Sequence, residues 1–349
     1  MTTKVAILGA CGVIGQRYVQ MLNNHPKFEV TALVDVYPGK KYSEVTDWGH
    51  GGGFDIDIPD YVRDMKMVSP DDIGSDVSLA FSGLPSKVAG QMEEKLAKKG
   101  VVVVTKAGDY RMEADVPLII PEVNPQHLSL IKEQRRNHGW KGAIVTAPNC
   151  STSTFVVPLK PVYDKVGVKK LTIVTMQAFS GAGYPGVPSL DITDNVIPYI
   201  GGEEEKLDIE SKKILGDGKK PAEYKINVYC NRVPTLDGHL ESVFLETKKK
   251  ITVDEMKQAM RDFPGTGLYT GPEKPVIVRE EKNRPQTRID RYAGKGPSPY
   301  TAGMSVTCGR FRDLGDNEMS FVCLAHNTIR GGAGEAILIG ELLEKKGYL

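Results

Sequence analysis

Long apolar runs and an excess of either charge are both missing from this sequence. No stretch of about 18 consecutive apolar residues occurs, so no transmembrane helix is expected. The 45 Lys and Arg residues balance 44 Asp and Glu residues without runs of like charge. We therefore expect no binding to nucleic acid or membranes, although a small charged ligand remains possible. Met1 leads into a strand-like segment rather than a signal peptide, which favours a cytoplasmic protein.

Cysteines are few and widely spaced. The chain has five in 349 residues, and no two form a CxxC pair, which argues against a disulfide scaffold. No group of His, Cys and Asp residues shows the spacing of metal ligands, so no metal is expected. A cysteine with a special role is better explained by catalysis than by structure.

The composition is that of an ordinary globular protein. Hydrophobic residues make up 40% of the chain and charged residues 26%, which excludes a mainly disordered state. At about 100–200 residues per domain, a chain of this length forms about two domains.

The first half of the chain alternates strand-like and helix-like segments. Continuous apolar runs predict buried strands at residues 4–8, 28–34, 77–82 and 101–104. Helical spacing occurs between them, at 16–22 and 87–98. Because parallel strands need crossover helices, this alternation predicts an α/β domain with a doubly wound parallel sheet.

The second half has a different pattern. Strand-like segments occur at 172–177, 225–232 and 241–247, and helices are expected near 204–215, 252–262 and 334–343. The last two strand-like segments flank an Asp-Gly turn at 237–238, which favours antiparallel strands in this half. Residues 269–302 are rich in proline, glycine and charge, and we interpret them as an irregular excursion or an interface arm. The mostly apolar helix at 334–343 is expected to pack back on the first domain.

A glycine turn joins the first strand to the first helix. It comprises Gly9, Ala10, Cys11, Gly12, Val13, Ile14 and Gly15. Such a turn presents backbone N–H groups and a helix N-terminus to a pyrophosphate. The turn departs from the usual GxGxxG, and a plain tight turn is the alternative. Its position at the start of a βαβ pattern favours a dinucleotide-binding domain at residues 1–149.

Asp35 ends the second strand, about 20 residues after the last glycine of the turn. A carboxylate at this position accepts hydrogen bonds from the ribose hydroxyls of NAD and repels the 2′-phosphate of NADP. The alternative is a solvated loop acid.

Cys150 follows Pro148 and Asn149, where a strand end passes into small hydroxyl residues that suit a helix start. A helix N-terminus stabilises a thiolate, which makes Cys150 a candidate nucleophile. The alternative is a buried inert cysteine, a role that fits the other four better. A thiolate also needs a base, and His239, one of six histidines, is a candidate just past the Asp-Gly turn. It could equally be a surface or core histidine.

Six segments carry a resemblance that covers essentially the whole chain. They are 9–15 (GACGVIG), 148–152 (PNCST), 177–186 (QAFSGAGYPG), 202–206 (GEEEK), 230–239 (CNRVPTLDGH) and 326–331 (HNTIRG). Together and in this order, they resemble the aspartate-semialdehyde dehydrogenases of the archaeal and fungal branch. The resemblance implies a Rossmann-type domain closed by a C-terminal helix at 331–349, an α+β catalytic and dimerisation domain at 150–330, and a homodimer or homotetramer.

The resemblance also implies a reaction. It is the NAD(P)H-dependent reductive dephosphorylation of L-4-aspartyl phosphate to L-aspartate 4-semialdehyde, in the biosynthesis of lysine, threonine and methionine. The implied partners are this small substrate and phosphate, and the family expectation for the cofactor is NADP. A cysteine acyl-thioester suits the reaction because it accepts hydride more readily than a free carboxylate does.

Site residues follow from the resemblance position by position. Cys150 is the implied nucleophile and His239 its acid/base partner, while Gln177 and Asn149 orient the thiolate and the acyl group. The implied substrate ligands are Arg232 for the α-carboxylate, Glu203 for the α-ammonium, and Lys206 with Arg111 for phosphate. Without the resemblance, Glu203 and Lys206 could be solvated helix charges, and Arg111 could belong to a structural ion pair. The resemblance implies that Ser82, Gly83, Ser180, Gly181 and Asn327 line the nicotinamide side of the cofactor. They add to the cofactor-binding residues already proposed from the sequence itself, which are Asp35 and the glycine turn of Gly9, Ala10, Cys11, Gly12, Val13, Ile14 and Gly15.

The chain departs from the family pattern at three places. Cys11 replaces a Thr in the glycine turn, where backbone groups supply most of the phosphate contact. Lys106 replaces an Asn, which puts a positive charge near the substrate and nicotinamide; it could alter substrate preference or add a cation for phosphate. The loop at 36–41 is shorter than the family's Ser/Arg-rich loop. NAD and NADP both remain open, because Asp35 favours NAD while Lys40 or Lys41 could still reach a 2′-phosphate.

Two rival functions remain. Malonyl-CoA reductases share this scaffold and chemistry, although malonyl-CoA has no α-ammonium for Glu203 to bind. The second rival is a non-catalytic paralogue that binds a nucleotide or a partner as a sensor. The intact set of Cys150, Gln177, Arg232 and His239 argues against a sensor.

Overall fold

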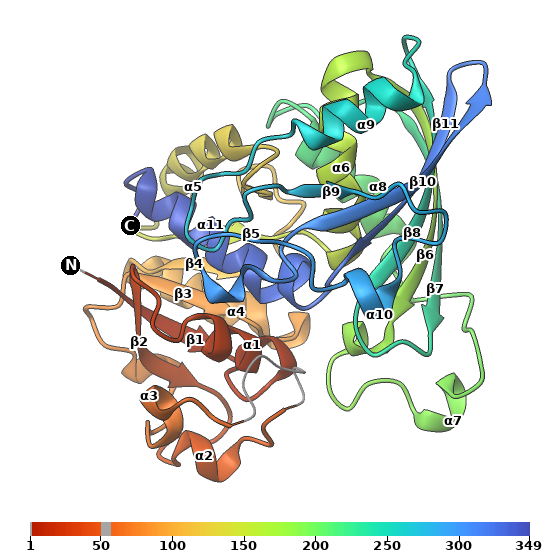
Figure 1. Ribbon diagram of the computed structural model, residues 1–349. Coiled ribbons are helices and arrows are strands. Elements are labelled where there is room, and N and C mark those ends of the chain that lie inside the picture. The colour runs from red at the N-terminus through yellow and green to blue at the C-terminus, as the bar shows by residue number, and fades with distance from the viewer. Residues whose placement is uncertain (1, 50–56) are drawn as a thin grey trace. The chain divides into compact units, whose positions relative to one another are not determined.

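The computed structural model describes residues 2–49 and 57–349, which form two compact units (Figure 1). The first unit comprises Met1–Ile119, Pro125–Pro148 and Gly332–Leu349. The second comprises Ile120–Asn124 and Asn149–Gly331. The C-terminal segment therefore returns to the unit in which the chain begins.

The first unit is built on a five-stranded parallel sheet in the order β2-β1-β3-β4-β5. Its strands are β1 (Thr3–Leu8), β2 (Phe28–Val34), β3 (Leu79–Ser82), β4 (Val102–Thr105) and β5 (Ala143–Thr146). Its helices are α1 (Val13–Met21), α2 (Tyr42–Val45), α3 (Asp60–Arg63), α4 (Ser86–Lys99), α5 (Leu130–His138) and α11 (Gly334–Lys345), with short 3-10 helices at Pro70–Asp72 and Pro125–Ser129. The predicted doubly wound parallel sheet is confirmed.

Helices cover both faces of this sheet, which explains the continuous apolar runs. Ala6 and Leu8 of β1 belong to one buried cluster together with Leu96 of α4. Phe81 of β3 instead stacks on Tyr18 of α1 and meets Gly340 of α11, where an added Cβ would lie 2.8 Å from the ring. The expected C-terminal helix is thus part of the core of the first unit.

The second unit is built on a six-stranded mixed sheet in the order β7-β6-β8-β11-β10-β9. Its strands are β6 (Val168–Ala178), β7 (Lys225–Val233), β8 (His239–Thr247), β9 (Val276–Val278), β10 (Val306–Gly315) and β11 (Glu318–Ala325). Its helices are α6 (Cys150–Val166), α7 (Ser189–Ile192), α8 (Glu203–Leu215), α9 (Val253–Arg261) and α10 (Thr287–Asp290), with 3-10 helices at Phe179–Ala182 and Pro299–Thr301. A π-helical segment at Ile329–Ala333 begins in this unit and ends in the first two residues of the C-terminal part of the first unit. Helices α6, α8 and α9 pack on the sheet.

The turn at 237–238 does not close a simple hairpin. The predicted antiparallel strands are present, since β8 pairs antiparallel with β6 and β11. However, β6 lies between β7 and β8 and pairs with β7 in parallel. β6 has 11 residues and fills the gap between its two neighbours, so the strands that flank the turn do not pair with each other.

An ion pair fixes residues 120–124 within the second unit. The Arg330 guanidinium donates to both carboxylate oxygens of Glu122, at 2.6 and 2.9 Å, and both side chains are fully buried. This bidentate geometry compensates the cost of removing two charges from water. The ion pair links residues 120–124 to Arg330, and the next residue, Gly331, lies against Cys150 at the start of α6.

Candidate active site

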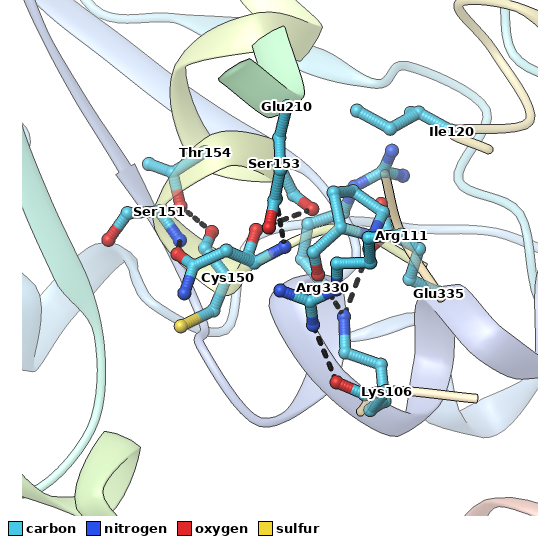
Figure 2. A network of polar contacts seen from close by, with 12 residues as sticks. Lys106, Arg111, Ile120, Cys150, Ser151, Ser153, Thr154, Glu210, Arg330 and Glu335 are labelled. Carbon is cyan, nitrogen blue, oxygen red and sulfur yellow. Dashed lines mark hydrogen bonds and ion pairs between the residues drawn. The ribbon is translucent and has the colours of Figure 1, made fainter. Parts of the chain in front are cut away.

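Cys150 is the first residue of α6, as the sequence predicts. The preceding residue, Asn149, is the N-cap, and its Oδ1 accepts a hydrogen bond of 2.9 Å from the backbone N–H of Ser151. Figure 2 shows the Cys150 side chain projecting from this first turn. The thiol therefore lies at the positive end of the helix dipole, which favours its thiolate form.

His239 lies beside this thiol. Its Nε2 lies 3.1 Å from the Cys150 Sγ. The other ring nitrogen, Nδ1, accepts a hydrogen bond of 3.1 Å from the backbone N–H of Ala178. Because Nδ1 is occupied as an acceptor, the proton of the neutral ring resides on Nε2 and points at the sulfur.

Protonation of His239 is strongly disfavoured. Burial, followed by the charge of nearby Arg232, lowers the pKa of His239 to about 3. An imidazolium would also turn an N–H at Nδ1 toward the N–H of Ala178. His239 is therefore neutral at physiological pH and acts on the sulfur, or on an oxygen next to it, as a hydrogen-bond donor.

Arg232 lies on β7 beside this pair. Its guanidinium donates to the Ala178 carbonyl at 2.8 Å, and burial lowers its pKa while the neighbouring Cys150 and Glu203 oppose that shift. A Cβ added at Gly181 would lie 3.0 Å from Arg232 Nη1 and 3.3 Å from His239 Nε2. The turn at Phe179–Ala182 therefore passes directly over both side chains.

Asn327 and Ser180, both predicted to line the site, meet at the same turn, and Gln177 lies on β6 beside Arg232. Asn327 donates to the Ser180 hydroxyl at 2.8 Å and accepts from the Gly238 N–H at 2.8 Å, so it links two turns. Gln177 is buried on β6 in register with Arg232, and its amide donates to the Thr175 hydroxyl at 3.3 Å.

Glu203 connects the start of α8 to Asn149, the residue that precedes the nucleophile. Its Oε2 accepts from the Asn149 side-chain amide at 2.8 Å, and its Oε1 accepts from Lys206 Nζ at 3.0 Å. The second unit thus brings together Cys150 with most of the residues that the sequence assigns to catalysis and substrate binding.

Three residues near Cys150 were missed by the sequence analysis. Glu210 accepts from the Asn149 backbone N–H at 2.7 Å, and a Cβ added at Gly331 would lie 2.5 Å from the Cys150 Cβ. Glu241 is fully buried, two residues after His239 on the same face of β8. Two signals were available, because Glu210 lies two helical turns after Glu203 and Glu241 shares the strand period of His239.

Burial favours the neutral form of Glu241. Burial raises the pKa of this carboxyl well above its ordinary value, the hydroxyl of Ser151 opposes the shift, and the charge of Glu203 adds to it. A neutral acid beneath the first turn of α6 adds no negative charge next to the Cys150 thiol.

The glycine turn of the first unit forms an open helix N-terminus. Helix α1 begins at Val13, and Gly12 caps it without a side-chain hydrogen bond. A Cβ on Gly15 would lie 2.0 Å from the Gly9 carbonyl oxygen, so only glycine fits there. Gly83 packs against the same turn, 3.3 Å from the Gly15 nitrogen by the same measure. These residues fit the pyrophosphate site predicted for a dinucleotide.

Asp35 supports this turn from the end of β2. Its carboxylate accepts from the Cys11 N–H at 2.9 Å and from the Val36 N–H at 2.8 Å. Lys41, one of two lysines that could meet a 2′-phosphate, pairs instead with Asp64 at 2.8 Å. Burial raises the pKa of the Cys11 thiol to about 11, so this cysteine is no rival nucleophile.

Three other predicted residues of the first unit have partners within it. The Ser82 hydroxyl donates to the buried Glu93 at 2.6 Å. Arg111 donates to the Lys106 carbonyl at 2.5 Å. Lys106 Nζ donates to the Pro148 carbonyl at 2.6 Å and lies 3.5 Å from the Glu335 carboxylate. Glu335 therefore compensates the charge that Lys106 introduces.

Residues 2–49 and 57–349 contain no group of three or more His, Cys, Asp or Glu side chains that could hold a metal ion. Across the same residues, no helix is both long and apolar enough to cross a membrane.

Comparison with known proteins assigns both halves of the chain to one family. Residues 4–131 match the semialdehyde dehydrogenase NAD binding domain, and residues 159–330 match the semialdehyde dehydrogenase dimerisation domain. The chain is 47% identical to an aspartate-semialdehyde dehydrogenase of Archaeoglobus fulgidus, over 99% of both chains. It is 40% identical to a malonyl CoA reductase (NADP) of Metallosphaera sedula, over 100% of this chain and 98% of the relative.

A solved structure shares the fold over its full length. The aspartate semialdehyde dehydrogenase of Candida albicans, solved with NADP, superposes with a TM-score of 0.87 at 36% identity, covering 100% of both chains. The two-unit architecture is therefore that of this family.

The neutral state of Glu241 predicts a specific pH dependence of stability. Above the ordinary carboxyl pKa, the unfolded chain has lost a proton that native Glu241 keeps, so this residue makes stability fall as pH rises. Glu241→Gln preserves the shape without titrating. We expect the melting temperature of the variant, relative to the original protein, to rise between about pH 5 and about pH 8. Thermal unfolding of both proteins measures this, and a difference independent of pH would contradict it.

Proposed function

The chain belongs to the semialdehyde dehydrogenase family, and from that premise we propose how its residues perform the reaction. It is an oxidoreductase that converts L-4-aspartyl phosphate to L-aspartate 4-semialdehyde and phosphate with NAD(P)H, a step of amino-acid biosynthesis. The observation that carries the proposal is the 3.1 Å contact between Cys150 Sγ and His239 Nε2 at the start of α6. This contact places a nucleophile and a hydrogen-bond donor where both can act on the same acyl group.

Cys150 forms the covalent bond to the substrate. Its thiolate attacks the β-acyl carbon, the C–O bond to phosphate breaks, and an acyl-thioester remains on Sγ. The bound cofactor supplies a hydride to the thioester carbon. His239 Nε2–H stabilises the resulting oxyanion, and cleavage of the C–S bond then releases the aldehyde and restores the thiolate.

Charged residues hold the two ends of the substrate. Arg232 pairs with the α-carboxylate, and Glu203 binds the α-ammonium through Oε1. This ammonium replaces Lys206 as the partner of that oxygen, which frees Lys206 Nζ for the phosphate. Arg111 supplies a second cation for the phosphate, Gln177 orients the acyl group, and Asn149 holds Glu203 in place.

We propose that the two units contact different parts of the cofactor. The first unit binds NAD or NADP at the turn that comprises Gly9 to Gly15, with the pyrophosphate at the N-terminus of α1. Gly83 packs against this turn, and Ser82 comes directly before Gly83 in the chain. Asp35 accepts hydrogen bonds from the adenosine ribose. Ser180, Gly181 and Asn327 of the second unit serve the nicotinamide end of the cofactor.

The second unit also forms the dimer, which we propose as the minimal assembly of a homodimer or homotetramer. Tyr229 and Phe244 are 62% and 43% exposed on strands of its sheet. Both lie in rows with Val174 and Thr172 of β6, on the sheet face opposite to buried Cys230 and Glu241. Exposed aromatic residues on a flat sheet face suit a second copy of the chain. We further propose a cytoplasmic location, because the acyl phosphate and the cofactor are intracellular metabolites.

Acyl-CoA reduction is the second candidate function. It is favoured by the 40% identical relative whose name specifies malonyl CoA. Glu203, already bound to an ammonium in the Lys206 pair, favours a substrate that carries an α-ammonium.

Enzyme assays distinguish these functions. With aspartate semialdehyde, phosphate and oxidised cofactor, we expect turnover that requires phosphate. Cys150→Ala should lower kcat by at least about 10⁴-fold, because it removes the nucleophile. Turnover of malonyl-CoA with reduced cofactor, but not of the semialdehyde, would contradict the proposal and support acyl-CoA reduction.

Cofactor preference tests Asp35. Its carboxylate repels a 2′-phosphate, so Asp35→Ser should increase the ratio of kcat/KM for NADP to that for NAD by about 10-fold or more, since 1.4 kcal/mol corresponds to tenfold. Lys40→Ala is the control for a lysine contact to the 2′-phosphate. If Lys40 makes this contact, its removal lowers the same ratio. An unchanged ratio in Asp35→Ser would show that Asp35 only supports the glycine turn.

A further inference from the structure

Two carboxylates of α8 hold the residue that precedes the nucleophile. Glu203 accepts from the side-chain amide of Asn149 at 2.8 Å, and Glu210 accepts from its backbone N–H at 2.7 Å. The two glutamates are seven residues apart, which places them on one face of the helix, two turns apart. Figure 2 shows Glu210 extended toward the backbone at the start of α6.

The contact between Glu210 and Asn149 is buried and directional. Glu210 is 1% exposed and Asn149 is 8% exposed. A hydrogen bond from a backbone N–H to a carboxylate is charge-assisted and gains strength where water is excluded. Asn149 has an extended backbone, with φ −56° and ψ 146°, immediately before the helical turn of Cys150. Fixing its N–H therefore fixes the direction in which the chain enters α6.

We propose that Glu210 is a positioning residue for Cys150. Its carboxylate clamps the Asn149 backbone so that Sγ meets His239 Nε2. Asn149 in turn caps the helix through Oδ1, so the clamp acts on both the peptide before the nucleophile and the turn that carries it. The inference rests on the proposed function only in that Cys150 is the nucleophile.

Glu210 complements Glu203 rather than repeating it. In the proposed reaction Glu203 shares its carboxylate with the substrate ammonium, so its hold on Asn149 changes as substrate binds and leaves. The bond from Glu210 goes to the backbone of Asn149 and is independent of the substrate. We therefore expect Glu210 to affect kcat and the reactivity of Cys150, with little effect on KM.

Two substitutions separate the effect of side-chain length at position 210 from the effect of its charge. Glu210→Asp keeps the charge but shortens the side chain by one methylene, which withdraws the acceptor from the Asn149 N–H. Glu210→Gln loses the charge but keeps an acceptor oxygen at the same reach. Glu205→Asp and Glu205→Gln are matched controls, because Glu205 lies on the exposed side of the same helix.

Iodoacetamide reactivity provides a readout that does not depend on the substrate. Burial raises the pKa of the Cys230 thiol to about 12 and those of Cys308 and Cys323 well above the ordinary value. Burial likewise raises the pKa of the Cys11 thiol to about 11. Labelling near neutral pH therefore reports on Cys150, and peptide mass spectrometry identifies the labelled residue.

The proposal predicts an order among the variants. Glu210→Asp should lower kcat by about 100-fold with KM within about twofold, because a small misplacement of a reacting group has an effect of this size. It should also slow alkylation of Cys150. Glu210→Gln and both Glu205 variants should stay within about tenfold of the original protein in both measurements.

Several results would overturn the proposal. They are equal kcat and alkylation rates in Glu210→Asp and the original protein, a larger loss in Glu210→Gln than in Glu210→Asp, or a loss that matches only the fraction of unfolded protein in a melting curve. If no protein turns over the semialdehyde, the proposed function fails, while the alkylation rates still decide the role of Glu210.

Discussion

The hydrogen bond between the Ser151 N–H and Asn149 Oδ1 determines where α6 begins, and the rest of the site depends on it. Because the helix starts at Cys150, the thiol lies at the positive end of the helix dipole and contacts His239, the first residue of β8. The same asparagine links two carboxylates of α8 to this point. One capping residue thus joins the nucleophile, the proposed substrate ligand Glu203 and the buried Glu210.

The electrostatics around Cys150 are a balance of opposing effects. The helix dipole and Arg232 favour a thiolate. In contrast, the carboxylates of Glu203 and Glu210 bind Asn149, which places negative charge close to the Cys150 thiol. Glu241 adds no charge while it is protonated. His239 contributes a hydrogen bond but no positive charge, since the Ala178 N–H occupies Nδ1. Such a thiol is activated by local dipoles and hydrogen bonds more than by an ion pair with histidine.

The sequence predicted features that depend on local chemistry. The parallel sheet follows from apolar runs separated by helices, and the glycine turn and the helix start at Cys150 follow from short segments. Features set by distant partners were not accessible. Nothing local shows that β6 would separate β7 from β8, or that Glu335, 229 residues from Lys106 in the sequence, would compensate its charge. The burial of Glu241 likewise depends on strands and helices that the sequence order does not bring together.

Direct detection of the acyl-enzyme tests the central claim, that Cys150 carries the substrate as a thioester. The protein would be mixed with aspartate semialdehyde and oxidised cofactor without phosphate, quenched in acid and analysed by intact-protein and peptide mass spectrometry. The account predicts a burst of about one reduced cofactor per subunit and an aspartyl adduct on the peptide that contains Cys150, which phosphate discharges. Cofactor reduction without any adduct on Cys150, or an adduct on another residue, would contradict it.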